Sequence, residues 1–67
     1  MAVLKVIEVL ASSSKSWEDA TQQAVSEASK TVKNIRSAYV QDQSVVVVDG
    51  QVSEYRVTLK LSFLIEH

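Results

Sequence analysis

Residues 45–52 read VVVVDGQV, and this stretch decides the fold. Asp-Gly between two runs rich in β-branched residues is the strongest short hairpin signal, because a type I′ turn needs positive φ at both central positions. Gly50 is also the only glycine in the chain. The stretch therefore predicts a β-hairpin in which one long strand ends at Val48 and a second runs from Gln51 to Ile65.

A two-residue turn also determines which residues lie opposite each other, because the paired numbers then sum to 99. One face is predicted to be the core face, and it carries Ala38, Val40, Val46, Val48, Tyr55, Val57, Leu59, Leu61 and Phe63. The other face is polar and pairs Ser37 with Ser62, Tyr39 with Lys60, Gln41 with Thr58, Gln43 with Arg56 and Val45 with Glu54. A β-bulge in either strand would shift these pairs by one residue, so the pairs far from the turn are predicted with less certainty than those next to it.

Upstream of the hairpin, the pattern predicts a further strand. Residues 3–10 (VLKVIEVL) are apolar and β-branched apart from Lys5 and Glu8, which suits a strand covered on one face. The serine-rich residues 12–16 that follow favour a loop, because short hydroxyl side chains bond to nearby backbone groups.

A helix is predicted to begin after this loop. Ser16 is the expected N-cap, and Glu18 and Asp19 place negative charge in the first turn, where the helix dipole favours it. The apolar residues then recur at helical spacing over about 18 residues. They are Trp17, Ala20, Ala24, Val25, Ala28, Val32 and Ile35.

The length of the chain points to self-association. A single domain of 67 residues buries only about 60% of its unfolded surface, so its core usually needs a supplement. There is no cysteine to form a disulfide, and a structural zinc is disfavoured because the only histidine is His67. By elimination, oligomerisation is the expected supplement.

The charge pattern excludes several classes of partner. Seven basic and eight acidic residues give a net charge of −1 with no basic run, so a nucleic-acid partner is not expected. No apolar run approaches the roughly 20 residues of a membrane span, and the first residues lack the pattern of a signal peptide. A cytoplasmic protein without a membrane partner is therefore expected.

The sequence also argues against an enzyme. Without cysteine, and with histidine only at residue 67, no nucleophile has a base, and a single glycine cannot form a phosphate-binding loop. The carboxylates are Glu8, Glu18, Asp19, Glu27, Asp42, Asp49, Glu54 and Glu66, without the spacing of a calcium loop. In a symmetric oligomer, copies of one carboxylate near an axis can still form a cation site. Glu8 is the candidate for such a site. An open strand face or a salt bridge, however, explains more simply why a carboxylate occurs within this apolar strand.

Two aromatic residues are candidates for contacts beyond the sheet. Trp17 lies at the first helical position on the apolar stripe, which favours core packing over ligand stacking. Tyr39, on the polar face beside Lys60, is expected to make a subunit contact or to offer a stacking platform.

In order and spacing, the segments resemble the dodecin family over nearly the whole chain. The resemblance is carried by KVIEVLASSSKSWEDA (residues 5–20), SKTVKNIRSAYV (residues 29–40) and YRVTLKLSF (residues 55–63). It implies one α+β domain, residues 1–67, with βαββ order and a three-stranded antiparallel sheet partly wrapped around one helix. It further implies that the chain is its own partner, in a hollow homododecamer of cubic-type symmetry.

The resemblance also implies where a ligand would bind. Many dodecins bind flavins such as riboflavin or FMN, with the isoalloxazine ring stacked on a tryptophan and its edge bonded by a glutamine. Those positions fall on Ser37 and Arg56, and the predicted register independently places both on the polar face. Serine offers no ring to stack on, so the pattern is closer to dodecins that lack the tryptophan, such as calcium dodecin.

Two functions remain open from the sequence. The first is a non-enzymatic shell that binds, stores or sequesters a small ligand, with flavin as the ligand known in the family. The second is a structural assembly, or one that binds calcium or another ion at its symmetry axes without flavin.

Overall fold

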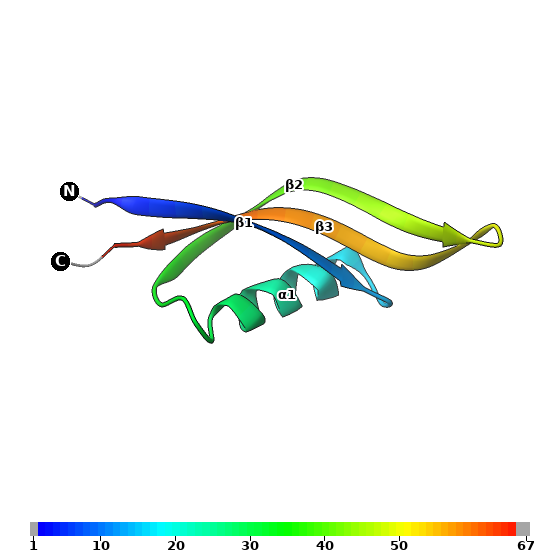
Figure 1. The fold of residues 1–67 in the computed structure, drawn as a ribbon, viewed down its shortest axis with the longest axis horizontal. Coiled ribbons are helices and arrows are strands. Elements are labelled where there is room, and N and C mark those ends of the chain that lie inside the picture. Colours follow the sequence, from blue (N-terminus) through cyan, green and yellow to red (C-terminus); the bar gives the residue numbers. More distant parts are fainter. Residues whose placement is uncertain (1, 66–67) are drawn as a thin grey trace.

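A computed structural model describes residues 2–65, which form four elements in the order βαββ (Figure 1). They are β1 (Leu4–Ser13), α1 (Trp17–Ala28), β2 (Ile35–Val48) and β3 (Gln51–Leu64). The strands form one antiparallel sheet in the order β1-β3-β2, so β3 is the central strand and α1 crosses one face. This confirms the predicted α+β fold. Glu66 and His67, on which two of the sequence arguments fall, lie outside the described residues.

The hairpin turn is formed as predicted. Asp49 has φ 51° and Gly50 has φ 75°, so both central residues are left-handed, as a type I′ turn requires. Next to the turn, Val48 lies opposite Gln51 and Val47 opposite Val52.

The helix begins as predicted but is shorter. Ser16 caps it, since its Oγ accepts from the Asp19 backbone N–H at 2.9 Å. The helix has 12 residues and ends at Ala28, not near residue 34. The Lys30 and Thr31 backbone N–H groups bond to the carbonyls three residues before them, those of Glu27 and Ala28, so the chain tightens into a turn after Ala28. Asn34 then adopts a positive φ of 64°, which turns the chain into β2.

The predicted loop at residues 12–16 is only partly correct, because Ser12 and Ser13 belong to β1. Ser13 pairs with Tyr55 and is buried, and its hydroxyl donates to the Asp19 carboxylate. A strand can end on hydroxyl residues when tertiary partners take up their hydrogen bonds.

The predicted register holds next to the turn and again from Ser37 to Val40, but it fails between these stretches and at the last pair, where Ile35 lies opposite Phe63. Irregularities next to Gln41 on β2 and Ser53 on β3 shift the middle pairs by one residue. Asp42 therefore faces Thr58, Ser44 faces Arg56 and Val46 faces Glu54. Each irregularity leaves an extra residue in one strand, and two on opposite strands cancel. The expectation that pairs far from the turn are the less certain ones holds for the last pair, Ile35 with Phe63, but not for the pairs from Ser37 to Val40, which keep the predicted register.

The core lies between β3 and α1. Its buried apolar residues are Val57, Leu59 and Leu61, which alternate along β3, and Ala20 of α1. Ile7, Val9 and Ala11 of β1 pack against them from the side. The alternation follows from the two-residue period of a strand.

The predicted core face was too wide. Ala38 and Val40 lie opposite Leu61 and Leu59 but are exposed, because α1 packs mainly against β1 and β3. Val48 is exposed as well, and Val46 lies on the opposite face from Tyr55 because the register is shifted there.

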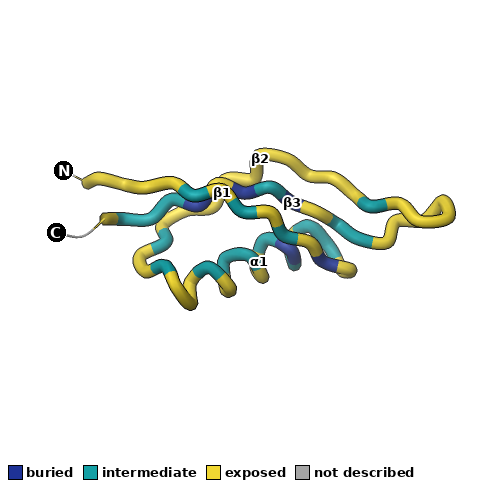
Figure 2. Tube along the Cα trace, viewed as in Figure 1, coloured by how far each residue is buried: buried dark blue, intermediate teal, exposed yellow. Residues whose placement is uncertain are grey.

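The hairpin extends well beyond the rest of the fold. Strand β1 ends at Ser13 opposite Tyr55, so residues 46–54, here called the arm, form a two-stranded ribbon (Figure 1). The radius of gyration is 13.7 Å, whereas a compact domain of this length has about 11 Å. Figure 2 shows that most of the arm is exposed. No helix within residues 2–65 is long and apolar enough to span a membrane.

The position of Leu59 gives a stability test. We expect Leu59→Ala to reduce the free energy of unfolding by about 2–5 kcal/mol, because it opens a cavity at the fully buried centre of the core. Arg36→Ala, at an exposed position, should change it by less than about 0.5 kcal/mol. Urea denaturation at equal protein concentration measures both. Equal effects of the two substitutions would contradict the assignment of the core.

Candidate functional site on the outer sheet face

The face of the sheet turned away from α1, here called the outer face, is open and largely polar. The strand pairing arranges it in four rows across β1, β3 and β2. From the termini toward the arm, these rows are Val6–Ser62–Ser37, Glu8–Lys60–Tyr39, Leu10–Thr58–Asp42 and Ser12–Arg56–Ser44. Both residues that the sequence singled out therefore lie on this face.

Ser37 lies in the first row, where the predicted pairing with Ser62 is confirmed. The hydroxyl groups of the two serines form a hydrogen bond with each other on the exposed surface. A hydroxyl pair offers a ligand small polar atoms but no flat apolar ring. The position can bond to the edge of a ligand, and it cannot stack on an aromatic face.

Arg56 lies in the fourth row, between Ser12 and Ser44, and not opposite Gln43 as the unshifted register predicts. Its side chain is exposed, and no carboxylate of the described residues lies within salt-bridge distance of it. A guanidinium with five N–H donors between two hydroxyls suits a ligand that accepts hydrogen bonds.

Between these two rows, the outer face carries charges of both signs. Glu8 faces Lys60, and Lys60 faces Tyr39 on its other side, as predicted for Tyr39. Asp42 lies in the neighbouring row. Within residues 2–65, the one salt bridge joins Glu27 of α1 to Lys30 just after the helix. Glu8 is therefore an exposed carboxylate on an open strand face without a salt bridge to any described residue.

A single subunit does not bring enough carboxylates together to hold a metal ion. No group of three or more acidic, cysteine or histidine side chains gathers anywhere in the described part of the chain. A divalent cation on this face would need carboxylates from more than one subunit, because calcium takes six to eight oxygen ligands.

Ser37 and Arg56 are also far apart within one subunit. Their rows cross β3 at Ser62 and at Arg56, six residues apart, which at about 3.3 Å per residue is about 20 Å. That distance exceeds the long axis of a tricyclic ring system. A small ligand that touches both positions must therefore lie between two subunits.

A polar cluster that was not predicted from the sequence lies at the start of α1. The Asp19 carboxylate accepts from the Ser13 hydroxyl and from the Gln23 amide, each at 2.6 Å. The Ser13 hydroxyl accepts from the Lys15 backbone N–H at 2.9 Å. The hydrogen bond from Ser13 is the main cause of the lowered pKa of Asp19. The cluster therefore connects the start of α1 to the end of β1 by hydrogen bonds. Its one signal in the sequence is Asp19, three residues after the N-cap Ser16.

Trp17 is a packing residue, as predicted. Its ring meets Tyr55 edge-to-face, with centroids 5.2 Å apart and planes at 80°. Its indole N–H donates to the Ser44 carbonyl at 3.0 Å, which ties α1 to β2. This tryptophan lies on the helix side of the sheet, away from the outer face that carries Ser37 and Arg56.

Comparison with known proteins identifies relatives over nearly the whole chain. The Dodecin family model matches residues 3–66. Calcium dodecin of Mycobacterium tuberculosis is 40% identical over 63 residues, which cover 94% of this chain and 89% of that protein.

Solved structures share the fold. Dodecin from Streptomyces coelicolor superposes with a TM-score of 0.93 at 32% identity, over 98% of this chain and 94% of that one. The crystal structure of the M. tuberculosis calcium dodecin, described as having a novel calcium-binding site, superposes with a TM-score of 0.83 at 38% identity. The match covers 96% of this chain and 91% of that chain.

The cluster at Asp19 predicts a pH dependence of stability. Because its pKa is lowered from 3.8 in the folded chain, its contribution is present above 3.8 and is lost as the pH falls through the lowered value. We expect Asp19→Asn to flatten the decline of the melting temperature on acidification below pH 3.8. Glu18→Gln, in the same helical turn but outside the cluster, is the matched control. Identical acid profiles for wild type and Asp19→Asn would show that the cluster does not couple to folding.

Proposed function

Because the chain belongs to the Dodecin family, we propose that it is the subunit of a hollow, non-enzymatic homododecamer. In this shell the polar sheet face of each subunit, the one turned away from α1, is directed inward and binds a small ligand. The coarser conclusion, dodecin-type binding of a small ligand, follows from family membership itself. The number of subunits and the position of the ligand are the proposal.

The observation that carries this proposal is the outer face. It is open, and apart from Val6 and Leu10 on β1 its rows carry hydroxyl, guanidinium, ammonium and carboxylate groups directed away from the core. The distance of about 20 Å between Ser37 and Arg56 supports a site shared by neighbouring subunits. A site shared in this way would exist only in the assembled protein.

Flavin is not the ligand that this face fits best. In the flavin-binding dodecins that the chain resembles, the ring lies on a tryptophan, and Ser37 occupies that position here. The lost stacking corresponds to about 0.5–1.5 kcal/mol for each aromatic pair, in addition to the buried ring area. Arg56 in place of glutamine favours a ligand with an acceptor-rich or anionic edge.

Restoring the two family residues tests the assignment of the positions. We expect wild-type protein to leave riboflavin fluorescence unquenched in a titration. The Ser37→Trp/Arg56→Gln double variant should quench it, because the ring-stacking and edge-bonding groups are both returned. Quenching is read at fixed riboflavin concentration against the particle concentration.

The matched control for that titration is Tyr39→Trp/Arg56→Gln. Tyr39 lies on the same face in the neighbouring row and is exposed, so this variant places the tryptophan one row away from Ser37. If the control quenches as well as the designed variant, a flavin site at Ser37 is excluded. Strong quenching by wild type would overturn the proposal that flavin is not its ligand.

Calcium is the second candidate ligand. It is favoured by two carboxylates, Glu8 and Asp42, that lie on the outer face without a salt bridge to any described residue. A relative of 40% identity is named for calcium. Copies of these carboxylates around a symmetry axis would supply the several oxygen ligands that the ion needs.

A chelator experiment tests this candidate. We expect calcium to raise the melting temperature relative to EGTA, because binding to the folded assembly stabilises it by about 2.7 kcal/mol at 100 times the dissociation constant. Glu8→Gln/Asp42→Asn should abolish the difference, whereas Glu27→Gln, whose carboxylate pairs with Lys30 on α1, should retain it. The same melting temperature in calcium and in EGTA would rule out a stabilising calcium site.

A further inference from the structure

The sheet is wider than the helix that covers it. Helix α1 packs mainly against β1 and β3, whereas β2 is the edge strand beside them. The side chains of β2 on the α1 side of the sheet are therefore exposed, although most of them are apolar. They are Ala38, Val40, Gln43 and Val45, which lie opposite core-side residues of β3.

A cleft of about 400 Å³ lies between the first half of α1 and this part of β2. Pockets that hold small molecules have volumes of about 300–1,000 Å³, so the cleft has room for a small one. Its apolar walls come from Trp17 and Val25 of the helix and Val40 of the strand. Because it lies on the α1 side of the sheet, the cleft is separate from the rows of the outer face.

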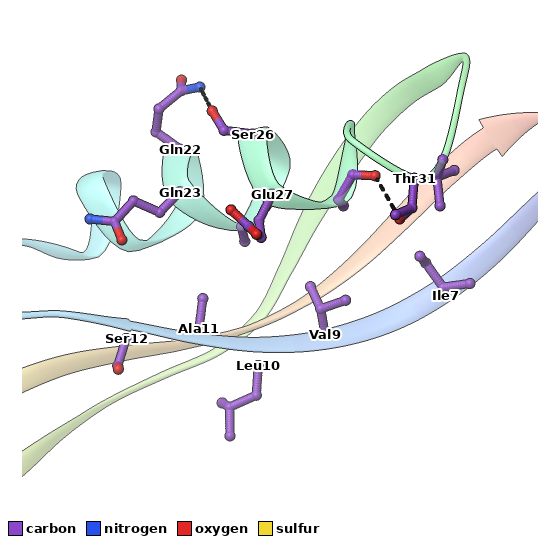
Figure 3. A pocket seen from close by; sticks show the side chains of 13 residues that line it. Ile7, Val9, Leu10, Ala11, Ser12, Gln22, Gln23, Ser26, Glu27 and Thr31 are labelled. Atoms are coloured by element: carbon purple, nitrogen blue, oxygen red, sulfur yellow. Dashed lines mark hydrogen bonds between the residues drawn. The ribbon is translucent and has the colours of Figure 1, made fainter.

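Most hydrogen-bonding groups around the cleft are already engaged. The Thr21 hydroxyl donates to the Trp17 carbonyl at 2.9 Å. The Gln22 amide donates to the Ser26 hydroxyl at 3.2 Å, a bond drawn in Figure 3. Because the Trp17 indole N–H already donates to the Ser44 carbonyl, the indole offers a ligand its ring but no donor.

The Glu18 carboxylate is the exception. It is exposed, and it makes neither a hydrogen bond nor a salt bridge with any described residue. It is also the one charged group in the lining, to which Gln43 adds an exposed amide from the β2 side. A carboxylate only accepts hydrogen bonds, so its complement is a positively charged donor. Calcium does not fit, because it takes six to eight oxygen ligands.

The larger groove on the other side of α1 has a different chemistry. Its volume is about 740 Å³, and Figure 3 shows Val9 and Ala11 directed from β1 toward the helix. The one acid in its lining, Glu27, already pairs with Lys30 at 3.0 Å. Of the two grooves, the smaller one is therefore where an unpaired carboxylate and an aromatic ring occur together.

We propose that the cleft between α1 and β2 binds a small organic cation, a protonated primary amine on an apolar or aromatic body. The ammonium group donates to the Glu18 carboxylate. The body packs against the Trp17 ring and between Val25 and Val40. The cleft is formed within one subunit, so this inference does not rest on the proposed shell or on its inward polar face.

Tryptophan fluorescence tests the proposal, because Trp17 is the only tryptophan of the chain and lines the cleft. The probe is 2-phenylethylammonium at neutral pH, with excitation where tyrosine does not absorb. We expect a saturable change in fluorescence. The uncharged 2-phenylethanol and the anionic 3-phenylpropanoate should bind more weakly by about fivefold or more, the value of an exposed ion pair. The same amine added to N-acetyltryptophanamide measures quenching by collision alone.

Three variants test the residues. Glu18→Gln should weaken binding of the amine about fivefold, whereas Glu27→Gln, a carboxylate of the same helix that lines the other groove, should leave it unchanged. Val40→Lys places an ammonium group in the cleft and should prevent binding. Val40 lies at a partly exposed position of an edge strand, so this variant is expected to fold.

The outcomes separate this inference from the proposed function. A fluorescence change no larger than that of N-acetyltryptophanamide would overturn the cleft as a binding site. Equal affinities for the amine and the alcohol, or an unchanged affinity in Glu18→Gln, would overturn the assignment of a cation. The Glu8→Gln/Asp42→Asn variant, which lacks carboxylates of the outer face, should bind the amine as the wild type does. Loss of binding in that variant would place the amine on the outer face and overturn the cleft.

Discussion

The alternation of side chains along β3 is the constraint on which the rest of the molecule depends. Val57, Leu59 and Leu61 point toward α1, so Arg56, Thr58, Lys60 and Ser62 must point away from it. The core and the outer face are two sides of one central strand. A slip of one residue would bury the charged set and expose the apolar set. The register that stabilises the fold therefore also positions the candidate site.

The three register shifts in the hairpin are compatible with that constraint because of where they lie. The extra residues are Arg36 and Gln41 on β2 and Ser53 on β3, and none of them interrupts β3 between Arg56 and Ser62. Between Gln41 and Ser53, β2 is displaced by one residue against β3; the original pairing returns from Val40 to Ser37, and the last pair, Ile35 with Phe63, is shifted again. Bulges increase local bending and twist, in keeping with the curved ribbons of Figure 1. The hairpin is thus curved, while the side chains of β3 from Arg56 to Ser62 keep their regular alternation between the two faces.

Local chemistry accounts for the features that could be predicted from the sequence. Asp49-Gly50 and the Ser16 cap each act through their own backbone neighbours, and both are as expected. The end of α1 was predicted wrongly because Val32 and Ile35 have the spacing expected of a helix although neither lies in one. Val32 lies in the connection after α1, and Ile35 is the first residue of β2, where it packs against the core. Ser37 and Arg56 were correctly placed on one face because β3 is regular between their rows. The row partners of Arg56 were missed because a bulge is selected by tertiary packing, for which sequence periodicity holds no signal.

The two faces of the sheet differ in what they contribute: the face toward α1 forms the core, and the outer face carries the exposed polar side chains. All of the fully buried apolar side chains lie on the α1 side, and the arm and the cleft between α1 and β2 lie outside the polar rows. At the position of the family's ring-stacking residue, Ser37 satisfies its hydroxyl with Ser62 inside the sheet, so the loss of a ring leaves no buried polar group unpaired. Because an exposed strand position contributes little to the core, a change there leaves the folding of the subunit intact. The side chain at such a position can therefore change without a change of fold, which is why resemblance identifies the fold more securely than a ligand.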